Sequence, residues 1–344
     1  YVVTKRGIGI KSIDAGFIVD HLCTSGTQPC TSYQSNTFEG LFYTIYDQNI
    51  NPLNSIIIRN SEFTDNNRGI YISGAYNLEV TSNTFDVGAT ELVNYLSDVS
   101  KSDGSSPVYE TFISYGLYLE NTPAFDVQEN TFYSNYSGAY GSIIWNSGTI
   151  IKELYNNTYH DLVIGLQSSE DNSGLQIKCN KFTANNSVTD IGITSGAIAL
   201  NQGYCSNDVT TPAGNTFSHP CIGSEDIFAN DDVASFTYVS HINDITSLQC
   251  YSHYYPFEII KLPEHPCTLT YSEQACPSKL NSGYTQQQLI AKINNANTQL
   301  PVLYSKIDGG NSQALLDIAA NSTINSGQLK NVLMAASPYL SDTV

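Results

Sequence analysis

The one cluster of acidic side chains, the residue type that most often performs acid–base chemistry on sugars, lies late in the chain. Glu225, Asp226, Asp231 and Asp232 fall within the run Ser-Glu-Asp-Ile-Phe-Ala-Asn-Asp-Asp. Glycoside hydrolysis needs two carboxylates that face one groove, and loop carboxylates also suit calcium. Asp231 and Asp232 are therefore candidate calcium ligands, against the simpler interpretation of a solvated loop. The sequence indicates no other cofactor.

The motifs of several hydrolase classes are missing. The chain has no paired Asp with Gly-His-Gly, as in polygalacturonases, no His-Glu-x-x-His and no Gly-x-Ser-x-Gly. Arginine, which would hold an anionic sugar in a lyase, is limited to Arg6, Arg59 and Arg68. We therefore predict no catalytic residue and a non-enzymatic function. The alternative is a carbohydrate-active enzyme, either a glycoside hydrolase or a polysaccharide lyase.

Aromatic side chains indicate a contact surface. The chain has 24 tyrosines and one tryptophan, Trp145, and Tyr133, Tyr136 and Tyr140 lie in a bend rich in Gly and Ser. Exposed tyrosine provides rigid, amphipathic contact area. We predict that these four residues, with the segment 88–115, contact a surface glycan or another surface protein. The competing interpretation is that the tyrosines cover strand edges.

The charge balance excludes one class of partner. The chain has 14 Lys and Arg against 32 Asp and Glu, a net charge of −18. Binding to nucleic acid needs clustered basic residues, so we predict no nucleic-acid partner, and a polyanionic glycan would be repelled. No run approaches the roughly 18 apolar residues of a membrane span. We therefore predict no transmembrane segment in this chain.

The cysteines point to an oxidising compartment. Their number is even, and no two of them form a Cys-x-x-Cys pair. They are Cys23, Cys30, Cys179, Cys205, Cys221, Cys250, Cys267 and Cys276. Disulfides are typical of exported proteins, so we predict an extracellular or outer-surface location. Short spacing predicts Cys23–Cys30 and Cys267–Cys276. The remaining four allow three pairings, and the sequence does not choose among them.

A short motif, Asn followed two residues later by Phe or Tyr, recurs along the chain. Most repeats are 22–27 residues long, and an insert doubles one interval to 47; the aromatic positions are Phe38, Phe63, Phe85, Phe132, Tyr159, Phe182 and Phe217. A period of this size is typical of a solenoid. Alternating strands such as Gly69-Ile70-Tyr71-Ile72 and Gly116-Leu117-Tyr118-Leu119 accompany it.

These repeats predict an all-β solenoid, a right-handed parallel β-helix. Coils must stack to bury their inner faces, so the aromatic residues should form an inner stack and the Asn residues a ladder at the bends. A leucine-rich repeat would need a regular Leu-x-x-Leu-x-Leu frame, which is absent.

The repeat fades near its C-terminal end, which divides the chain into three predicted parts. Residues 1–218 are the coils, 219–276 an irregular β cap pinned by disulfides, and 277–344 an α-helical segment that we expect to continue in a longer parent chain. In the cap, Phe236–Val239 and Phe257–Ile260 are predicted strands. In the last segment, Thr285, Asn311, Ser326 and Ser337 are predicted helix caps.

Several runs in the second half of the chain carry a resemblance to a known group of proteins. They are Ile177–Phe182, Asp190-Ile191, Asn201–Gly203, Pro212–Phe217, Ile307–Asn311, Leu315-Leu316 and Ser337–Asp342. With them the chain resembles large right-handed parallel β-helix repeat surface proteins of Bacteroidota, especially flavobacterial ones that are similar to substrates of the type IX secretion system. The resemblance implies an adhesin, a stalk or a component of an envelope assembly, in some cases linked to gliding. Its motifs are structural, so no catalytic residue is carried over.

Overall fold

The computed structural model describes residues 6–25, 33–88, 92–94, 109–111, 113–136, 138–183, 189–204, 208, 210–218, 225–239, 257–260, 275–280, 312–320 and 325–336. The chain divides into two compact units, Tyr1–Pro277 and Ser278–Val344. In the first unit the described elements are almost all β-strands, and in the second they are two α-helices.

Three parallel sheets form the body of the first unit. The first sheet has eight strands, β1 (Ile8–Ile13), β6 (Tyr43–Gln48), β9 (Arg68–Ser73), β14 (Ser114–Glu120), β17 (Ala139–Trp145), β20 (Ile164–Ser169), β23 (Thr189–Ile193) and β25 (Glu225–Ala229). The second has six, β2 (Phe17–Val19), β7 (Ser55–Arg59), β10 (Asn77–Thr81), β15 (Phe125–Gln128), β18 (Lys152–Tyr155) and β21 (Leu175–Lys178). The third also has six, β5 (Asn36–Glu39), β8 (Ser61–Asn66), β11 (Thr84–Val87), β16 (Thr131–Tyr133), β19 (Thr158–His160) and β22 (Lys181–Thr183).

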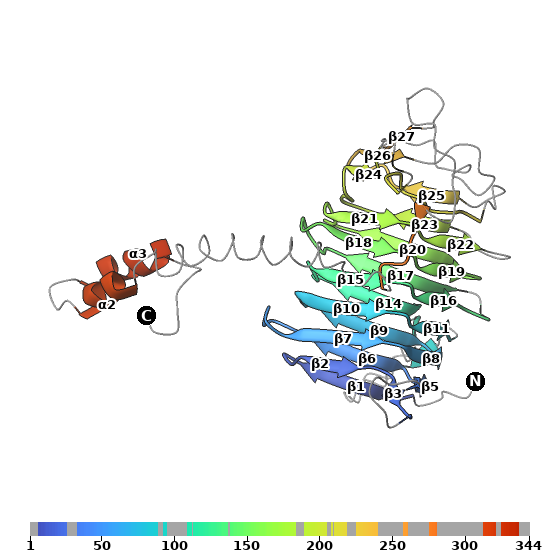
Figure 1. The fold of residues 1–344 in the computed structure, drawn as a ribbon, viewed down its shortest axis with the longest axis horizontal. Helices are drawn as coiled ribbons and strands as arrows, with labels where there is room; N and C mark the ends of the chain where they lie inside the picture. Colours follow the sequence, from blue (N-terminus) through green and yellow to red (C-terminus); the bar gives the residue numbers. More distant parts are fainter. Residues whose placement is uncertain are drawn as a thin grey trace, which may run out of the picture. The chain divides into compact units, whose positions relative to one another are not determined.

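The chain visits these sheets in turn. Strands β6, β7 and β8 make one coil, and β9, β10 and β11 make the next coil directly above it (Figure 1). Neighbouring strands pair in parallel throughout the three sheets. Parallel strands joined by crossovers are almost always connected in the right-handed sense. The fold is the right-handed parallel β-helix that the sequence predicts.

The predicted aromatic stack fills the interior. From Phe38 to Phe217 successive rings lie 4.5 to 5.8 Å apart between centroids and within 10° of parallel. Phe63, Phe85, Phe132 and Phe182 are at most 2% exposed, which confirms their predicted place in the core. Such offset ring pairs add to the free energy gained by burying apolar area.

The predicted Asn ladder is also present. The side-chain oxygens of Asn130, Asn157, Asn180 and Asn215 each accept the backbone N–H of the ladder Asn one coil earlier, at 2.8 to 3.0 Å. The residue before each ladder position has a positive φ, between 53° and 62° at Ser82, Glu129, Asn156 and Cys179. Because that bend removes backbone groups from the sheets, the amides take over their hydrogen bonds.

Parallel pairing continues past residue 218. Strand β25 extends the first sheet, and a further sheet joins β24 (Asn201–Gln202), β26 (Phe236–Val239) and β27 (Phe257–Ile260) in parallel. The last two are the strands predicted in the cap. Residue 218 therefore marks the end of the Asn-x-aromatic repeat and not the end of strand stacking. The described residues of the unit also include two short antiparallel pairs, β3 (Leu22–Cys23) with β4 (Tyr33–Gln34) and β12 (Leu92–Asn94) with β13 (Tyr109–Thr111).

The structure corrects the predicted pairing of two cysteines. Cys276 pairs with Cys179, with the two Cα atoms 5.5 Å apart, and not with Cys267. None of the three pairings left open among Cys179, Cys205, Cys221 and Cys250 is therefore formed. Cys179 occupies the bend just before Asn180, and Ala275 and Cys276 pack at that bend, so stacking and not sequence distance selects the partner. Cys23 also takes part in a disulfide. Its predicted partner Cys30, and Cys205, Cys221, Cys250 and Cys267, lie outside the described residues.

The second unit contains α2 (Ser312–Ala320) and α3 (Ser326–Ala336). Asn325 caps α3, not Ser326: its side chain accepts the N–H of Gln328 at 2.9 Å, and the Gln328 side chain accepts the N–H of Asn325 at 3.3 Å. This reciprocal pair is a capping box. The predicted caps Thr285, Asn311 and Ser337 lie outside the described residues. Among the residues that are described, no helix is long and apolar enough to cross a membrane.

Candidate functional site

Three tyrosines form a row on the outer face of the first sheet. Tyr46, Tyr71 and Tyr118 occupy equivalent positions on β6, β9 and β14. Their ring centroids are 5.0 and 5.5 Å apart, and each side chain is partly exposed. We call this row the tyrosine strip. The strands position it because their neighbouring residues, such as Ile70 and Ile72, point into the core.

A cationic side chain supports the strip from one side. The guanidinium of Arg68 lies 4.9 to 5.7 Å from the ring centroids of Phe42, Tyr43 and Tyr115 and donates a hydrogen bond to the Tyr43 hydroxyl. Tyr43 and Tyr115 in turn contact rings of the strip. Cation–π contacts of this kind hold side chains in place. Tyr115 is only 4% exposed, so it positions the strip and offers little contact area itself.

The hydroxyl groups of the strip remain neutral donors. Burial, a hydrogen bond to Glu120 and the charge of Glu120 together raise the pKa of Tyr71 far above its ordinary value. Burial likewise raises the pKa of Tyr46 and of Tyr118. The strip therefore combines apolar ring surface with neutral hydroxyl groups, of which that of Tyr71 is held by Glu120, and a carboxylate and a guanidinium lie beside it. This arrangement suits a ligand that is itself amphipathic.

The four aromatic residues predicted to make contacts fall on two sheets. Tyr140 is in register with Tyr115, and Trp145, 37% exposed, is in register with Glu120, so both share the outer face of the first sheet with the strip. Tyr133 lies on the third sheet, stacked on His160 at 4.9 Å, and Tyr136 lies in the turn that follows. The structure thus places Tyr140 and Trp145 on the sheet that carries the strip, one strand beyond Tyr118, and Tyr133 and Tyr136 away from that sheet.

The residues predicted to bind calcium lie in a turn after β25. Asp231 and Asp232 are both exposed. Within the described part of the chain, no group of three or more His, Cys, Asp or Glu side chains could hold a metal ion. The calcium site stays a prediction that rests on these two side chains alone.

Of the other two acidic residues in that cluster, Asp226 is buried and Glu225 is partly exposed. Asp226 on β25 lies beside Asp190 on β23, inside the coil. Burial and, to a smaller extent, the charge of Asp226 together raise the pKa of Asp190 to about 7, although two hydrogen bonds donated by Ser218 act to lower this pKa. A carboxyl in such a place is neutral in mildly acidic solution and charged above neutrality.

Asp190→Asn should therefore remove a pH dependence of stability. The folded-state pKa is about 7, above the ordinary 3.8, so this group's stabilising contribution is complete below pH 3.8 and is lost as the pH rises through 7. Asparagine can keep both bonds to Ser218 without the charge. We expect the variant to unfold at higher urea concentration than wild type at pH 8, and at a similar one at pH 4. Equal pH profiles for the two proteins would contradict this assignment, and Asp231→Asn serves as the exposed control.

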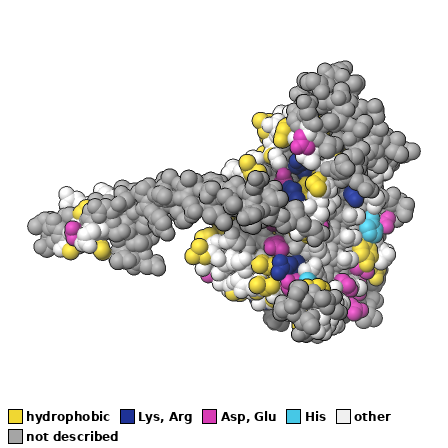
Figure 2. All heavy atoms as spheres, in the orientation of Figure 1, with side chains coloured by type: hydrophobic (Ala, Val, Ile, Leu, Met, Phe, Trp, Pro, Cys, Tyr) yellow, Lys and Arg dark blue, Asp and Glu magenta, His cyan; other side chains and the backbone are white. Residues whose placement is uncertain are grey.

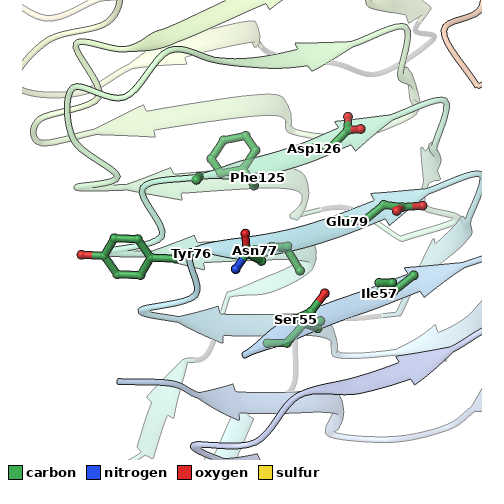
Figure 3. Close-up of a pocket in the computed structure, with 10 residues that line it drawn as sticks. Ser55, Ile57, Tyr76, Asn77, Glu79, Phe125 and Asp126 are labelled. Atoms are coloured by element: carbon green, nitrogen blue, oxygen red, sulfur yellow. The ribbon is translucent and has the colours of Figure 1, made fainter. Parts of the chain in front are cut away.

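A shallow groove crosses the outer face of the second sheet (Figure 3). It has a volume of about 350 Å³, and its lining includes Ser55, Ile57, Tyr76, Asn77, Glu79, Ala124 and Asp126. Glu79 and Asp126 are register partners on β10 and β15. Thr81 donates to Glu79 at 3.0 Å and Gln128 to Asp126 at 2.9 Å. No motif in the sequence marks this pair.

Comparison with known proteins identifies no relative. No family model, no curated protein and no solved structure matches the chain. On the face drawn in Figure 2, the Lys and Arg side chains of the described residues stand singly or in small groups and form no continuous patch among themselves.

Proposed function

We propose that this protein is a non-enzymatic, exported cell-surface module that binds a linear surface glycan along the tyrosine strip. The strip carries the proposal. It follows the stacking direction across β6, β9 and β14, and Lys11 on β1 lies over the ring of Tyr46 at 6.0 Å. Strands are about 4.8 Å apart, so these four strands span about 14 Å. An extended polymer can follow such a row.

The chemistry of the strip matches a sugar chain. Sugar rings combine apolar C–H faces with hydroxyl groups, and tyrosine offers both an apolar ring and a hydroxyl. Because the strip holds one carboxylate, Glu120, beside Arg68 and Lys11, it favours neither strongly anionic nor strongly cationic ligands. The acidic protein as a whole disfavours polyanions.

Two observations support an exported location. Cys179 and Cys276 form a disulfide, and Cys23 is disulfide-bonded. Disulfides persist mainly in oxidising compartments. The resemblance to Bacteroidota surface proteins adds the finer proposal of an adhesin, a stalk or an envelope component at the outer cell surface, exported by a type IX system and linked to gliding.

One observation favours the alternative, a carbohydrate-active enzyme. Glu79 and Asp126 face the same groove from neighbouring strands, and a retaining glycosidase needs two carboxyl groups about 5–5.5 Å apart. Against this, both carboxylates accept hydrogen bonds from neighbouring side chains, and Glu79 also lies 3.6 Å from Arg59. We therefore prefer glycan binding to catalysis as the proposed function.

The binding proposal predicts that Tyr46→Ala combined with Tyr118→Ala weakens glycan binding by about a hundredfold. Each lost aromatic contact should cost about 1.4 kcal/mol, or tenfold in affinity. The measurement is affinity electrophoresis over a panel of neutral and acidic polysaccharides, followed by calorimetry with the best binder. Binding should change little with salt, because the contacts are not ionic.

The control is Tyr76→Ala with Tyr136→Ala, which removes two exposed tyrosines from outside the strip. We expect this variant to bind as wild type does, and both variants to keep the wild-type unfolding temperature within a few degrees. If no polysaccharide binds, or if the two variants lose affinity equally, the strip is not a glycan site.

A further inference from the structure

The outer face of the first sheet repeats the same kinds of side chain from strand to strand. The tyrosine strip occupies one position on each of β6, β9 and β14, which are neighbours in the sheet (Figure 1). Two residues further along, the same strands carry a second row in register, formed by Gln48, Ser73 and Glu120, and none of these is fully buried. Side chains two positions apart on a strand point to the same face. Each strand therefore offers one tyrosine and, beside it, one polar side chain.

The distance of this repeat is close to the length of one sugar ring. The ring centroids of Tyr46, Tyr71 and Tyr118 follow one another at 5.0 and 5.5 Å, and neighbouring strands lie about 4.8 Å apart. When six-membered sugars are joined through equatorial bonds at C1 and C4, the two bonds leave opposite ends of the ring nearly in line. Each sugar then advances the chain by about one ring length and meets the next strand in the same way as the sugar before it.

A different linkage would break this match. An axial bond at C1 turns the chain at every sugar, so an α-1,4-linked polymer coils and leaves a straight row after one or two contacts. The register pairs hold the tyrosines in one row along the stacking direction. The row therefore fits a ribbon-shaped chain and not a coiled one.

The strip has a defined length, because other side chains take the same position on the next strand at either end. Lys11 on β1 is the register partner of Tyr46, and its ammonium lies 6.0 Å from the centroid of that ring. Ile143 on β17 is the partner of Tyr118 and is only 3% exposed. Trp145, 37% exposed, continues the polar row on β17 as the partner of Glu120. A ligand thus meets three tyrosines and then one indole ring.

The hydrogen-bonding groups of this face favour a neutral sugar. Tyr71 donates to Glu120, and Arg68 donates to Tyr43. The Tyr71 hydroxyl oxygen and the Glu120 carboxylate can still accept further hydrogen bonds, which sugar hydroxyl groups donate. A uronic acid would instead bring a carboxylate beside Glu120 on a protein of net charge −18.

We propose that the tyrosine strip selects a neutral β-1,4-linked polysaccharide of the glucose or mannose type, in which the bonds at C1 and C4 are both equatorial. The chain binds in extended form with one sugar over each strand. Three consecutive sugars contact the three tyrosines, and a fourth reaches Trp145. This inference rests on the proposed function and adds the linkage and the length of the bound segment to it.

The probes are short oligosaccharides of one sugar that differ in linkage, measured by calorimetry on the whole chain. They are β-1,4-linked and α-1,4-linked glucose, and β-1,4-linked and α-1,6-linked mannose. We expect the best β-1,4-linked tetrasaccharide to bind about tenfold or more tightly than the α-linked tetrasaccharide of the same sugar. Affinity in the β-1,4 series should rise at each step from two to four sugars and change by less than about twofold from four to six.

Trp145→Ala tests the length of the bound segment. Because the indole meets only the fourth sugar, the variant should bind the tetrasaccharide several times more weakly and the trisaccharide as wild type does. The matched control is Phe228→Ala, which removes a 36% exposed aromatic ring from β25, further along the same sheet. It should leave both affinities unchanged. Both side chains are partly exposed, so neither variant should lose its fold.

The outcomes separate this inference from the proposed function. Equal affinity for the two linkages, lost in Tyr46→Ala with Tyr118→Ala, would keep the strip as a glycan site and overturn the choice of linkage. A polysaccharide that binds while every β-1,4-linked tetrasaccharide fails would do the same. Equal losses of trisaccharide and tetrasaccharide in Trp145→Ala would overturn the length. If neither oligosaccharides nor polysaccharides bind, the proposed function fails as well.

Discussion

Asn130→Ala should lower the free energy of unfolding by about 3 to 5 kcal/mol. Its side-chain oxygen accepts bonds from the backbone and the side chain of Asn83, both at 3.0 Å, and its amide donates to Val80 O at 2.8 Å. Both ladder residues are buried. Truncation therefore leaves several buried polar groups unpaired, and each such group costs about 1–3 kcal/mol.

Urea unfolding followed by circular dichroism measures this loss. The matched control is Asn135→Ala, in an exposed turn, where the change should stay within about 0.5 kcal/mol. If Asn130→Ala were as stable as the control, the ladder would not contribute to holding the coils together.

Gly141→Ala should destabilise the protein by about 3 kcal/mol or prevent it from folding. A Cβ at this position would lie 2.4 Å from the carbonyl oxygen of Gly165 and 2.6 Å from the ring of Tyr159. Neither neighbour can move easily, because Gly165 belongs to the next strand and Tyr159 is held between Phe132 and Phe182. Overpacking of a rigid core costs about 1–3 kcal/mol and occasionally more.

The same sheet supplies the control for this substitution. At Gly192 on β23 the nearest atom to an added Cβ is 3.7 Å away, which is ordinary contact. Gly192→Ala should leave stability unchanged or raise it by up to about 1 kcal/mol, since alanine restricts the unfolded chain. Soluble yield and urea midpoints compare the two variants. Similar urea midpoints for the two variants would show that the core accommodates a Cβ at position 141, contrary to the short distances in the structure.

The core of this fold is readable from the sequence because it repeats locally. The Asn and the aromatic residue of each motif are two positions apart, so each coil carries its own ladder residue and its own core ring, as at Asn83 and Phe85. Their burial depends on the coil itself and on contact with its neighbours, which have the same motif. The hydrophobic periodicity of the sequence therefore predicts directly which residues of each motif are buried.

The outer surfaces could not be read in the same way, because they depend on register between coils. Tyr71 and Tyr118 are 47 residues apart, as are Glu79 and Asp126, since an insert separates their coils. The offset of 47 between Phe85 and Phe132 was the available signal, and it would have aligned both pairs. The Cys179–Cys276 disulfide joins residues 97 positions apart and depends on where the chain returns to the stack, which no local pattern reports.

The central claim, binding of a glycan without turnover, is tested most directly by measuring the polysaccharide itself. The best-binding polysaccharide is incubated with wild type, with Glu79→Gln plus Asp126→Asn, and with Asp231→Asn plus Asp232→Asn. Its chain length, reducing ends and unsaturated products are then followed. We predict that all three proteins bind the polysaccharide, that its chain length stays unchanged, and that no new reducing ends or unsaturated products form. Products that form with wild type and disappear with either double variant would contradict the account and make the protein a carbohydrate-active enzyme.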